Sequence, residues 1–141
     1  MDMKQYTITC SEEQLHLIAS AIEDWSRFLS GQCELHHATS MLMNHENYKE
    51  LNDAMENLHQ FVTPELPRGA SYSWNGGHCP NERQRKAIAM SYGIYRQILH
   101  FFACQKPKND WNCYQSPTLV CEEQGGLIQI TEKNLKLTQY G

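Results

Sequence analysis

Two long segments with helical periodicity, one towards each end of the chain, constrain the fold most strongly. The first begins at Ser11, which forms an S-x-x-Q capping box with Gln14, and Gly31 offers its C-terminal stop. The second covers 82 to about 104 and follows Asn81, another capping residue. Both segments repeat apolar residues at helical spacing, so the sequence predicts two long helices that pack on each other.

The first helix is expected to bury one apolar stripe, made of Leu15, Ile18, Ala19, Ile22, Trp25 and Leu29. Between the two long segments, the sequence predicts a short helix within 32–43 and a further helix over about 45–62, ended by Thr63 and Pro64. Residues 64–80 are rich in proline and glycine but also carry aromatic residues, which is typical of an ordered loop rather than a linker.

Strand signals lie nearer the two ends. Residues 4–9 alternate and are rich in β-formers, while 118–122 and 127–131 flank a Gln-Gly-Gly turn in a hairpin pattern. We therefore expect an α+β, mainly helical fold, with two long antiparallel helices, shorter helices, and a small antiparallel sheet from the N-terminal strand and the C-terminal hairpin. A length of 141 residues fits a single domain over 1–141.

Charge and hydropathy argue against several classes of function. Lys and Arg number 12 against 16 Asp and Glu, and the resulting net charge of −4 disfavours a generic binder of duplex nucleic acid or of a membrane surface. No stretch approaches the roughly 18 apolar residues of a membrane span, and the start lacks a signal-peptide core, so we expect an intracellular protein. The 6 cysteines contain no C-x-x-C pair and are expected to be reduced thiols that pack.

Signals for a metal or for catalysis are weak. His100 and Cys104 lie four residues apart, and Cys113 or the pair His78 and Cys79 could complete a tetrahedral set, but the spacing matches no zinc ribbon or finger. The sequence contains no G-x-S-x-G, no Walker loop and no G-x-G-x-x-G. We therefore expect no metal, no cofactor and no catalytic residues.

The sequence contains few arginines, and their positions indicate where an anionic ligand could bind: Arg27, Arg68, Arg83, Arg85 and Arg96. Arg83 opens the second long helix, where free backbone N–H groups favour an anion, and a guanidinium fork suits phosphate. Tyr72 and Trp74 could stack on a base, and Asn75 or Asn81 could read its polar edge. The alternative is that the arginines pair with surface acids and the aromatic residues cover the core.

Two blocks of sequence resemble a known family. The first is YTITCSEEQLHLIASAIEDWSRFLSGQ over 6–32, and the second is NERQRKAIAMSYGIYRQILHFF over 81–102. The second block contains a Tyr-x-x-Tyr-Arg-x-x-Leu-His pattern. Together, across most of the chain in size and layout, they resemble the first family of Thoeris anti-defence proteins, which bacteriophages encode.

The resemblance implies a sponge that sequesters immune signalling nucleotides unchanged in the cytoplasm of the infected bacterium. The signals would be glyco-cyclic ADP-ribose and, for some members, cyclic di- or trinucleotides from the cyclic-oligonucleotide (CBASS) systems. It also implies a homo-oligomer, in which dimers form hexamers with ligand sites between subunits. Arg27 and Arg96 would be phosphate partners. The predicted hairpin carries no arginine, and Lys106 and Lys108 could substitute for a charged contact there.

The expected ligand-binding set is Arg27, Arg68, Tyr72, Trp74, Asn81, Arg83, Arg96 and Lys106. Two rival functions remain open. One is a small adaptor that binds another protein and no nucleotide. The other is a nucleotide hydrolase, which would need a metal at His100 and Cys104.

Overall fold

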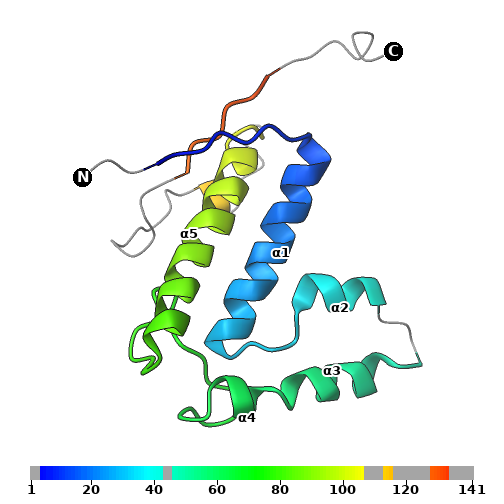
Figure 1. The fold of residues 1–141 in the computed structure, drawn as a ribbon. Coiled ribbons are helices and arrows are strands. Elements are labelled where there is room, and N and C mark those ends of the chain that lie inside the picture. Colours follow the sequence, from blue (N-terminus) through cyan, green and yellow to red (C-terminus); the bar gives the residue numbers. More distant parts are fainter. Residues whose placement is uncertain (1–3, 43–45, 107–112, 116–127, 134–141) are drawn as a thin grey trace.

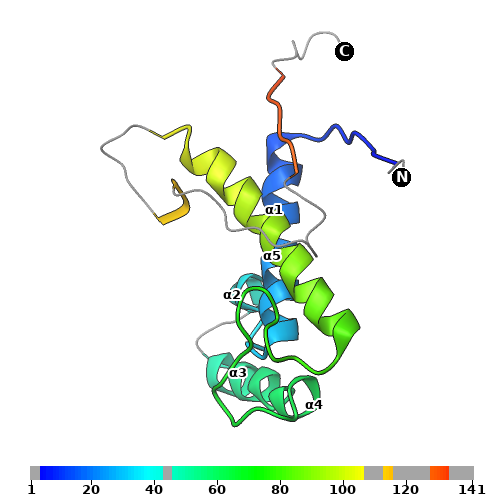
Figure 2. The same ribbon diagram turned by 90° about the vertical axis from the view of Figure 1, so that its left-hand side faces the viewer.

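The computed structural model describes residues 4–42, 46–106, 113–115 and 128–133 (Figure 1). The elements are α1 (Glu12–Ser30), α2 (His36–Leu42), α3 (Tyr48–Glu56), α4 (His59–Val62), α5 (Glu82–Ala103) and a 3-10 turn, η1 (Cys113–Gln115). The long helices α1 and α5 pack on each other, while α2, α3 and α4 gather where α1 ends and α5 begins (Figures 1 and 2). Within this described part, no helix is both long and apolar enough to cross a bilayer.

Both long helices begin and end as the sequence predicts. The Ser11 hydroxyl accepts from the backbone of Gln14 at 3.1 Å, and the Gln14 side chain accepts from the backbone of Ser11 at 2.8 Å. Gly31 ends α1 with a left-handed φ of 114°, a conformation that glycine adopts without steric cost. Asn81 caps α5 through a hydrogen bond from the backbone of Gln84 at 3.1 Å.

The two long helices run antiparallel, as predicted, and contacts at both ends of the pair hold them. The Gln84 side-chain amide donates to the carbonyl oxygen of Leu29 at 2.8 Å and to that of Val62 at 3.0 Å. It thereby joins the start of α5 to the ends of α1 and α4. At the other end, the rings of His16 and Phe102 stack with their centroids 4.0 Å apart.

The predicted apolar stripe of α1 is only partly buried. Ala19 lies in the interior, but Trp25 is 55% exposed and Ile18 is 37% exposed. Ile18 and Trp25 are seven residues apart, which puts them on one side of α1, and we call this exposed apolar pair the outer arc. The interior positions of α1 are largely polar, and we call this set the inner arc: Glu23, Asp24, Ser26 and Ser30. Apolar periodicity located the helix and part of its inward side, because Ala19 is buried and Leu29 packs against the core, whereas Ile18 and Trp25 face solvent.

The helix predicted over 45–62 is divided into α3 and α4. At the break, the N–H of Leu58 bonds to the carbonyl of Met55, three residues back, which tightens the chain relative to an α-helix. Asn57 lies at this turn, and asparagine favours turns because its side chain competes for backbone groups. The end of the second helix before Thr63 agrees with the prediction.

The proline- and glycine-rich loop contributes to the core, as an ordered loop should. Tyr72 and Cys79 are buried against Ile88 of α5. The backbone N–H of Tyr72 also donates to the carbonyl of Ser30, the last residue of α1, at 2.8 Å. The loop therefore closes the gap between the two long helices at the end where α2, α3 and α4 gather.

The predicted α+β class is wrong, because the described residues contain no strand and no sheet. Residues 4–10 are irregular, and Tyr6 and Ile8 are 84% and 81% exposed. Alternation of side chains favours a strand only where another strand pairs with its backbone and covers one face. Of the predicted hairpin, 118–122 and residue 127 lie outside the described residues, and 128–131 form no strand.

Candidate functional site

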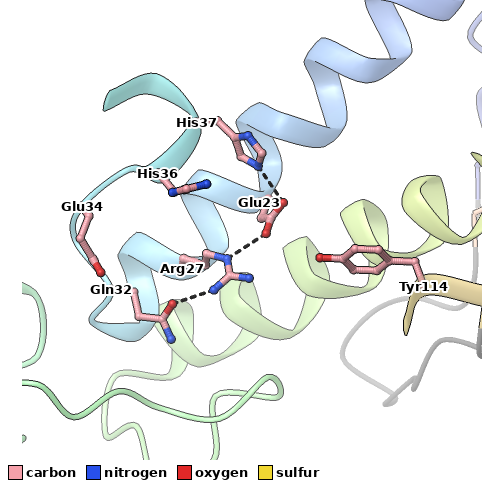
Figure 3. Close-up of a pocket in the computed structure, with 7 residues that line it drawn as sticks. All are labelled: Glu23, Arg27, Gln32, Glu34, His36, His37 and Tyr114. Carbon is pink, nitrogen blue, oxygen red and sulfur yellow. Dashed lines mark hydrogen bonds and ion pairs between the residues drawn. The ribbon is translucent and has the colours of Figure 1, made fainter. Parts of the chain in front are cut away.

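A pocket of about 420 Å³ lies between the second half of α1, the start of α2 and η1 (Figure 3). Residues from three neighbouring elements and the turn between α1 and α2 line it: Glu23, Arg27, Gln32, Glu34, His36, His37 and Tyr114. The pocket is open to solvent and carries groups of both charges.

Glu23 is the central carboxylate of the pocket, and it is only 7% exposed. Its Oε2 accepts from Nε of Arg27 at 2.9 Å, and its Oε1 accepts from Nε2 of His37 at 2.8 Å (Figure 3). Arg27 also donates from a terminal nitrogen to Oε1 of Gln32 at 2.8 Å. These bonds fix the guanidinium of Arg27 in one orientation at the pocket wall.

The same contacts set the charges of the pair. Burial alone raises the pKa of Glu23, but hydrogen bonds from His37 and Arg27 outweigh it and hold this pKa below 4.5, its ordinary value. Burial alone lowers the pKa of Arg27, but its hydrogen bond to Glu23 outweighs this effect and leaves the pKa above its ordinary value. Both groups are therefore charged at neutral pH.

Asp24 positions the histidines of the pocket by capping α2 from a neighbouring helix. Leu35, which precedes α2, has a φ of 50° and no side-chain acceptor for the first amides of the helix. The carboxylate of Asp24 accepts from the backbone of His37 at 2.9 Å and of Ala38 at 2.8 Å. A carboxylate at a helix N-terminus also interacts favourably with the helix dipole.

Tyr114 is held against α5 at the opposite wall. Its backbone carbonyl lies 2.8 Å from Nδ1 of His100, and the guanidinium carbon of Arg96 lies 4.6 Å from the centre of its ring. In Figure 3 the hydroxyl end of this ring points toward Glu23 and Arg27. The Nε of Arg96 is buried, and among the described residues no hydrogen-bond partner reaches it.

Aromatic rings from α5 and from the loop before it contact one another next to Arg96. The guanidinium of Arg96 lies 5.8 Å from the ring centre of Tyr92, which contacts Trp74 at 5.4 Å and Tyr95 at 5.5 Å between centroids. Burial raises the pKa of Tyr95 to about 12. Its hydroxyl therefore remains protonated at neutral pH.

Three residues of the expected binding set lie in or next to this region. Arg27 lines the pocket, Arg96 contacts the ring of Tyr114, and Trp74 connects to Arg96 through Tyr92. Arg68 lines a neighbouring pocket of about 160 Å³, which shares Gln32 and Glu34 with the first.

The other members of the expected set lie elsewhere. Tyr72 is buried in the core, and its hydroxyl donates to Glu65 at 2.5 Å. Asn81 caps α5, and Arg83 is exposed in the first turn of that helix. Lys106 is exposed just beyond the end of α5, and Lys108 lies outside the described residues.

The sequence prediction missed several residues that line the pocket: Glu23, Gln32, Glu34 and Tyr114. One signal was available, because Glu23 and Arg27 are opposite charges spaced i,i+4 on a helix. His36 and His37 fall within the predicted short helix, but only a tertiary contact, that of His37 with Glu23, gives His37 a role in the pocket.

Of the rival metal site, the described side chains bring together only His100 and Cys104, and the side chain of Cys113 lies outside the described part. The Sγ of Cys104 lies 3.6 Å from Nε2 of His100. The described residues contain no cluster of three or more histidine, cysteine, aspartate or glutamate side chains placed to hold a metal ion.

Comparisons with protein-family models, with curated proteins and with solved structures yield no match to this chain.

Proposed function

We propose that this protein binds an anionic nucleotide signal in the pocket and holds it without changing it. The observation that carries the proposal is the arrangement of Arg27 and Tyr114 at the walls of a 420 Å³ pocket. The side chain of Arg27 is 41% exposed, so part of its guanidinium is accessible to a ligand. Guanidinium groups suit phosphate, aromatic rings stack on bases, and small-molecule sites commonly measure about 300–1,000 Å³.

The mixture of charges favours a ligand that carries more than phosphate. The charge of Glu23 is already engaged by Arg27 and His37, whereas Glu34 adds a further carboxylate to the lining. A carboxylate accepts hydrogen bonds from ribose hydroxyls but repels additional phosphates. A nucleotide with a phosphate, a hydroxylated sugar and a flat base matches this lining better than an inorganic polyphosphate does.

The resemblance to the Thoeris anti-defence family narrows the proposed ligand to glyco-cyclic ADP-ribose or a cyclic di- or trinucleotide. On the same resemblance, we propose that the protein acts in the cytoplasm of an infected bacterium as a homo-oligomer built from dimers, up to a hexamer. We place the contact between copies at the outer arc, because exposed apolar and aromatic side chains such as Trp25 are common at interfaces.

Ligand retention and release tests this function directly. The protein is incubated with glyco-cyclic ADP-ribose and a panel of cyclic di- and trinucleotides, and free ligand is removed. The protein is then heated, and the released compound is identified by mass spectrometry. Intact ligand supports sequestration, altered ligand indicates a hydrolase, and no retained ligand across the panel refutes the proposal.

Two substitutions test whether the pocket is the binding site. Arg27→Ala and Arg96→Ala are each expected to weaken binding at least about tenfold, which corresponds to about 1.4 kcal/mol. The matched control is Lys49→Ala, an exposed cation on α3 that should leave affinity unchanged. Unchanged affinity in a folded Arg27→Ala variant would remove the pocket from the proposal.

A protein-binding adaptor is the second candidate, and the outer arc is the observation that favours it. The adaptor would retain no nucleotide in the same assay and would bind a polypeptide through this surface. Substitution of Trp25 would then abolish partner binding, whereas Arg27→Ala would not.

A further inference from the structure

His36 is the first residue of α2, and its exposed side chain lines the pocket. In Figure 3 its ring extends toward α1, on the side where Glu23 and Arg27 lie. Within the described part of the chain, its ring nitrogens make no hydrogen bond, and its ring meets that of His37 edge-on with the centroids 5.3 Å apart. Both ring nitrogens of His36 are therefore free to bind a ligand in the pocket.

The neighbouring histidine is already engaged by the protein. The Nε2 of His37 lies 2.8 Å from Oε1 of Glu23, and its backbone N–H donates to the carboxylate of Asp24 at 2.9 Å. Both acceptors belong to α1, so they hold His37 against that helix. Of the two histidines, His36 is the one that can turn its ring to a ligand.

The other charges of the lining do not favour an anion. Two carboxylates, those of Glu23 and Glu34, face one guanidinium, that of Arg27, so the lining carries one net negative charge while both histidines are neutral. Tyr114 on the opposite wall adds an uncharged phenol. An anionic ligand therefore needs further positive charge, and histidine is the side chain that gains such charge between about pH 5 and 8.

We propose that His36 in its protonated form binds the anionic group of the nucleotide, so that ligand binding takes up a proton from the solvent. This inference rests on the proposed function and adds His36 to Arg27 as a residue that binds the phosphate. The imidazolium N–H donates to a phosphate oxygen, and this charge-assisted hydrogen bond favours the protonated ring.

The coupling between proton and ligand is reciprocal, so the affinity for the nucleotide rises as the pH falls. Glu23 does not produce this dependence, because its pKa lies below 4.5 and the carboxylate stays charged over the same range. A lining whose positive charge came from Arg27 alone would bind the ligand equally at both ends of the range, since arginine remains protonated.

The experiment uses the full-length protein and two probes, glyco-cyclic ADP-ribose and cyclic di-AMP. Their phosphates are bridged on both sides, so they lack the ionisation at about pH 6 that a terminal phosphate shows. Isothermal titration calorimetry measures the affinity at about pH 5.5 and at about pH 8. We expect at least one probe to bind at least about fivefold more tightly at the lower pH. Titrations in two buffers with different enthalpies of ionisation should show net proton uptake.

Substitutions at two histidines separate His36 from the rest of the protein. His36→Asn removes the titrating ring and should bind the probe at about pH 8 as the unaltered protein does, without the gain at lower pH. His36→Arg carries a permanent charge and should bind tightly at both pH values. The matched control is His78→Asn, at an exposed histidine outside the pocket with a φ of 70°, which asparagine tolerates. This control should keep the full pH dependence.

The outcomes distinguish this inference from the proposed function. Equal affinity at both pH values in the unaltered protein, or a pH dependence that survives in His36→Asn, would overturn the role of His36 and leave nucleotide binding standing. If neither probe bound at either pH, both the role of His36 and the proposed function would be overturned, because a protonated His36 should favour binding at the lower pH.

Discussion

The inner and outer arcs of α1 invert the usual distribution of polarity on a surface helix. The inner arc buries Glu23, Asp24, Ser26 and Ser30, whereas the outer arc exposes Ile18 and Trp25. Each buried carboxylate is matched to donors: Glu23 to two charged or polar side chains, and Asp24 to two backbone amides. Buried charge is tolerated where such partners satisfy it.

The contrast shows that the two sides of α1 have different roles in the structure. The inner arc assembles the pocket and attaches α2, so its polar residues act through specific bonds. Burial of apolar surface is non-directional, so the outer arc can associate with another apolar surface without a specific bonding geometry. Three substitutions test this division, from the largest expected effect on the fold to the smallest.

Asp24→Ala is expected to have the largest effect, lowering the free energy of unfolding by about 2–3 kcal/mol. The change leaves two amides at the start of α2 without their acceptor. Chemical denaturation monitored by circular dichroism measures this loss. Asp24→Asn keeps one acceptor oxygen and should fall between Asp24→Ala and the unaltered protein.

The control for this substitution is Asp53→Ala, which alters an exposed aspartate on α3 and should change stability by less than about 0.5 kcal/mol. A loss at Asp24 no larger than at Asp53 would mean that α2 does not depend on the inner arc.

Glu23→Gln is expected to lower the free energy of unfolding by about 1–2 kcal/mol at pH 7, because charged hydrogen bonds to Arg27 and His37 are weakened. The folded-state pKa of Glu23 lies below 4.5, so the contribution of the carboxylate is fully present above that value. It is lost as the pH falls through the lowered folded-state pKa. Denaturation at a series of pH values should therefore show the two proteins converging in acid.

Glu50→Gln provides the matched control, because Glu50 is an exposed glutamate on α3. Its difference from the unaltered protein should be small at neutral pH. A Glu23→Gln difference that persists or grows in acid would contradict the role given to this carboxylate.

Trp25→Ser is expected to have the smallest effect on the folded chain, within about 0.5 kcal/mol at a protein concentration low enough for copies to separate. At higher concentration it should reduce the mass of the assembly measured by light scattering, since the outer arc loses its largest apolar side chain. Met41→Ser, which alters an apolar residue of α2 that is 81% exposed, is the control. An unchanged mass in Trp25→Ser would remove the outer arc from the interface.

The sequence predicted local features of the fold well. The caps at Ser11 and Asn81 and the stop at Gly31 depend on residues within one helical turn, so their chemistry is readable from spacing alone. The prediction of a sheet was wrong because a strand needs a second segment to pair with. The alternation of side chains at 4–9 does not indicate whether such a segment lies beside it.

The candidate site was also only partly predictable, because its lining depends on segments that are distant in the sequence. The sequence predicts Arg27 and Arg96 as ligand-binding residues, and the structure places both near Tyr114. Glu34 and Tyr114 carried no local signal. Their positions in the pocket depend on the turn after α1 and on the docking of η1 against α5, which are tertiary contacts.

The two hydrogen bonds that the Gln84 side-chain amide donates have a consequence for the order in which the chain can fold. Its contact with Val62 closes a loop of 22 residues, whereas its contact with Leu29 closes one of 55 residues. The entropic cost of closing a loop grows with the logarithm of its length, so closing the shorter loop costs about 0.8 kcal/mol less than closing the longer one. The end of α4 therefore reaches the start of α5 at lower entropic cost than α1 does. Once that short loop is closed, the same amide is already in place to receive the end of α1.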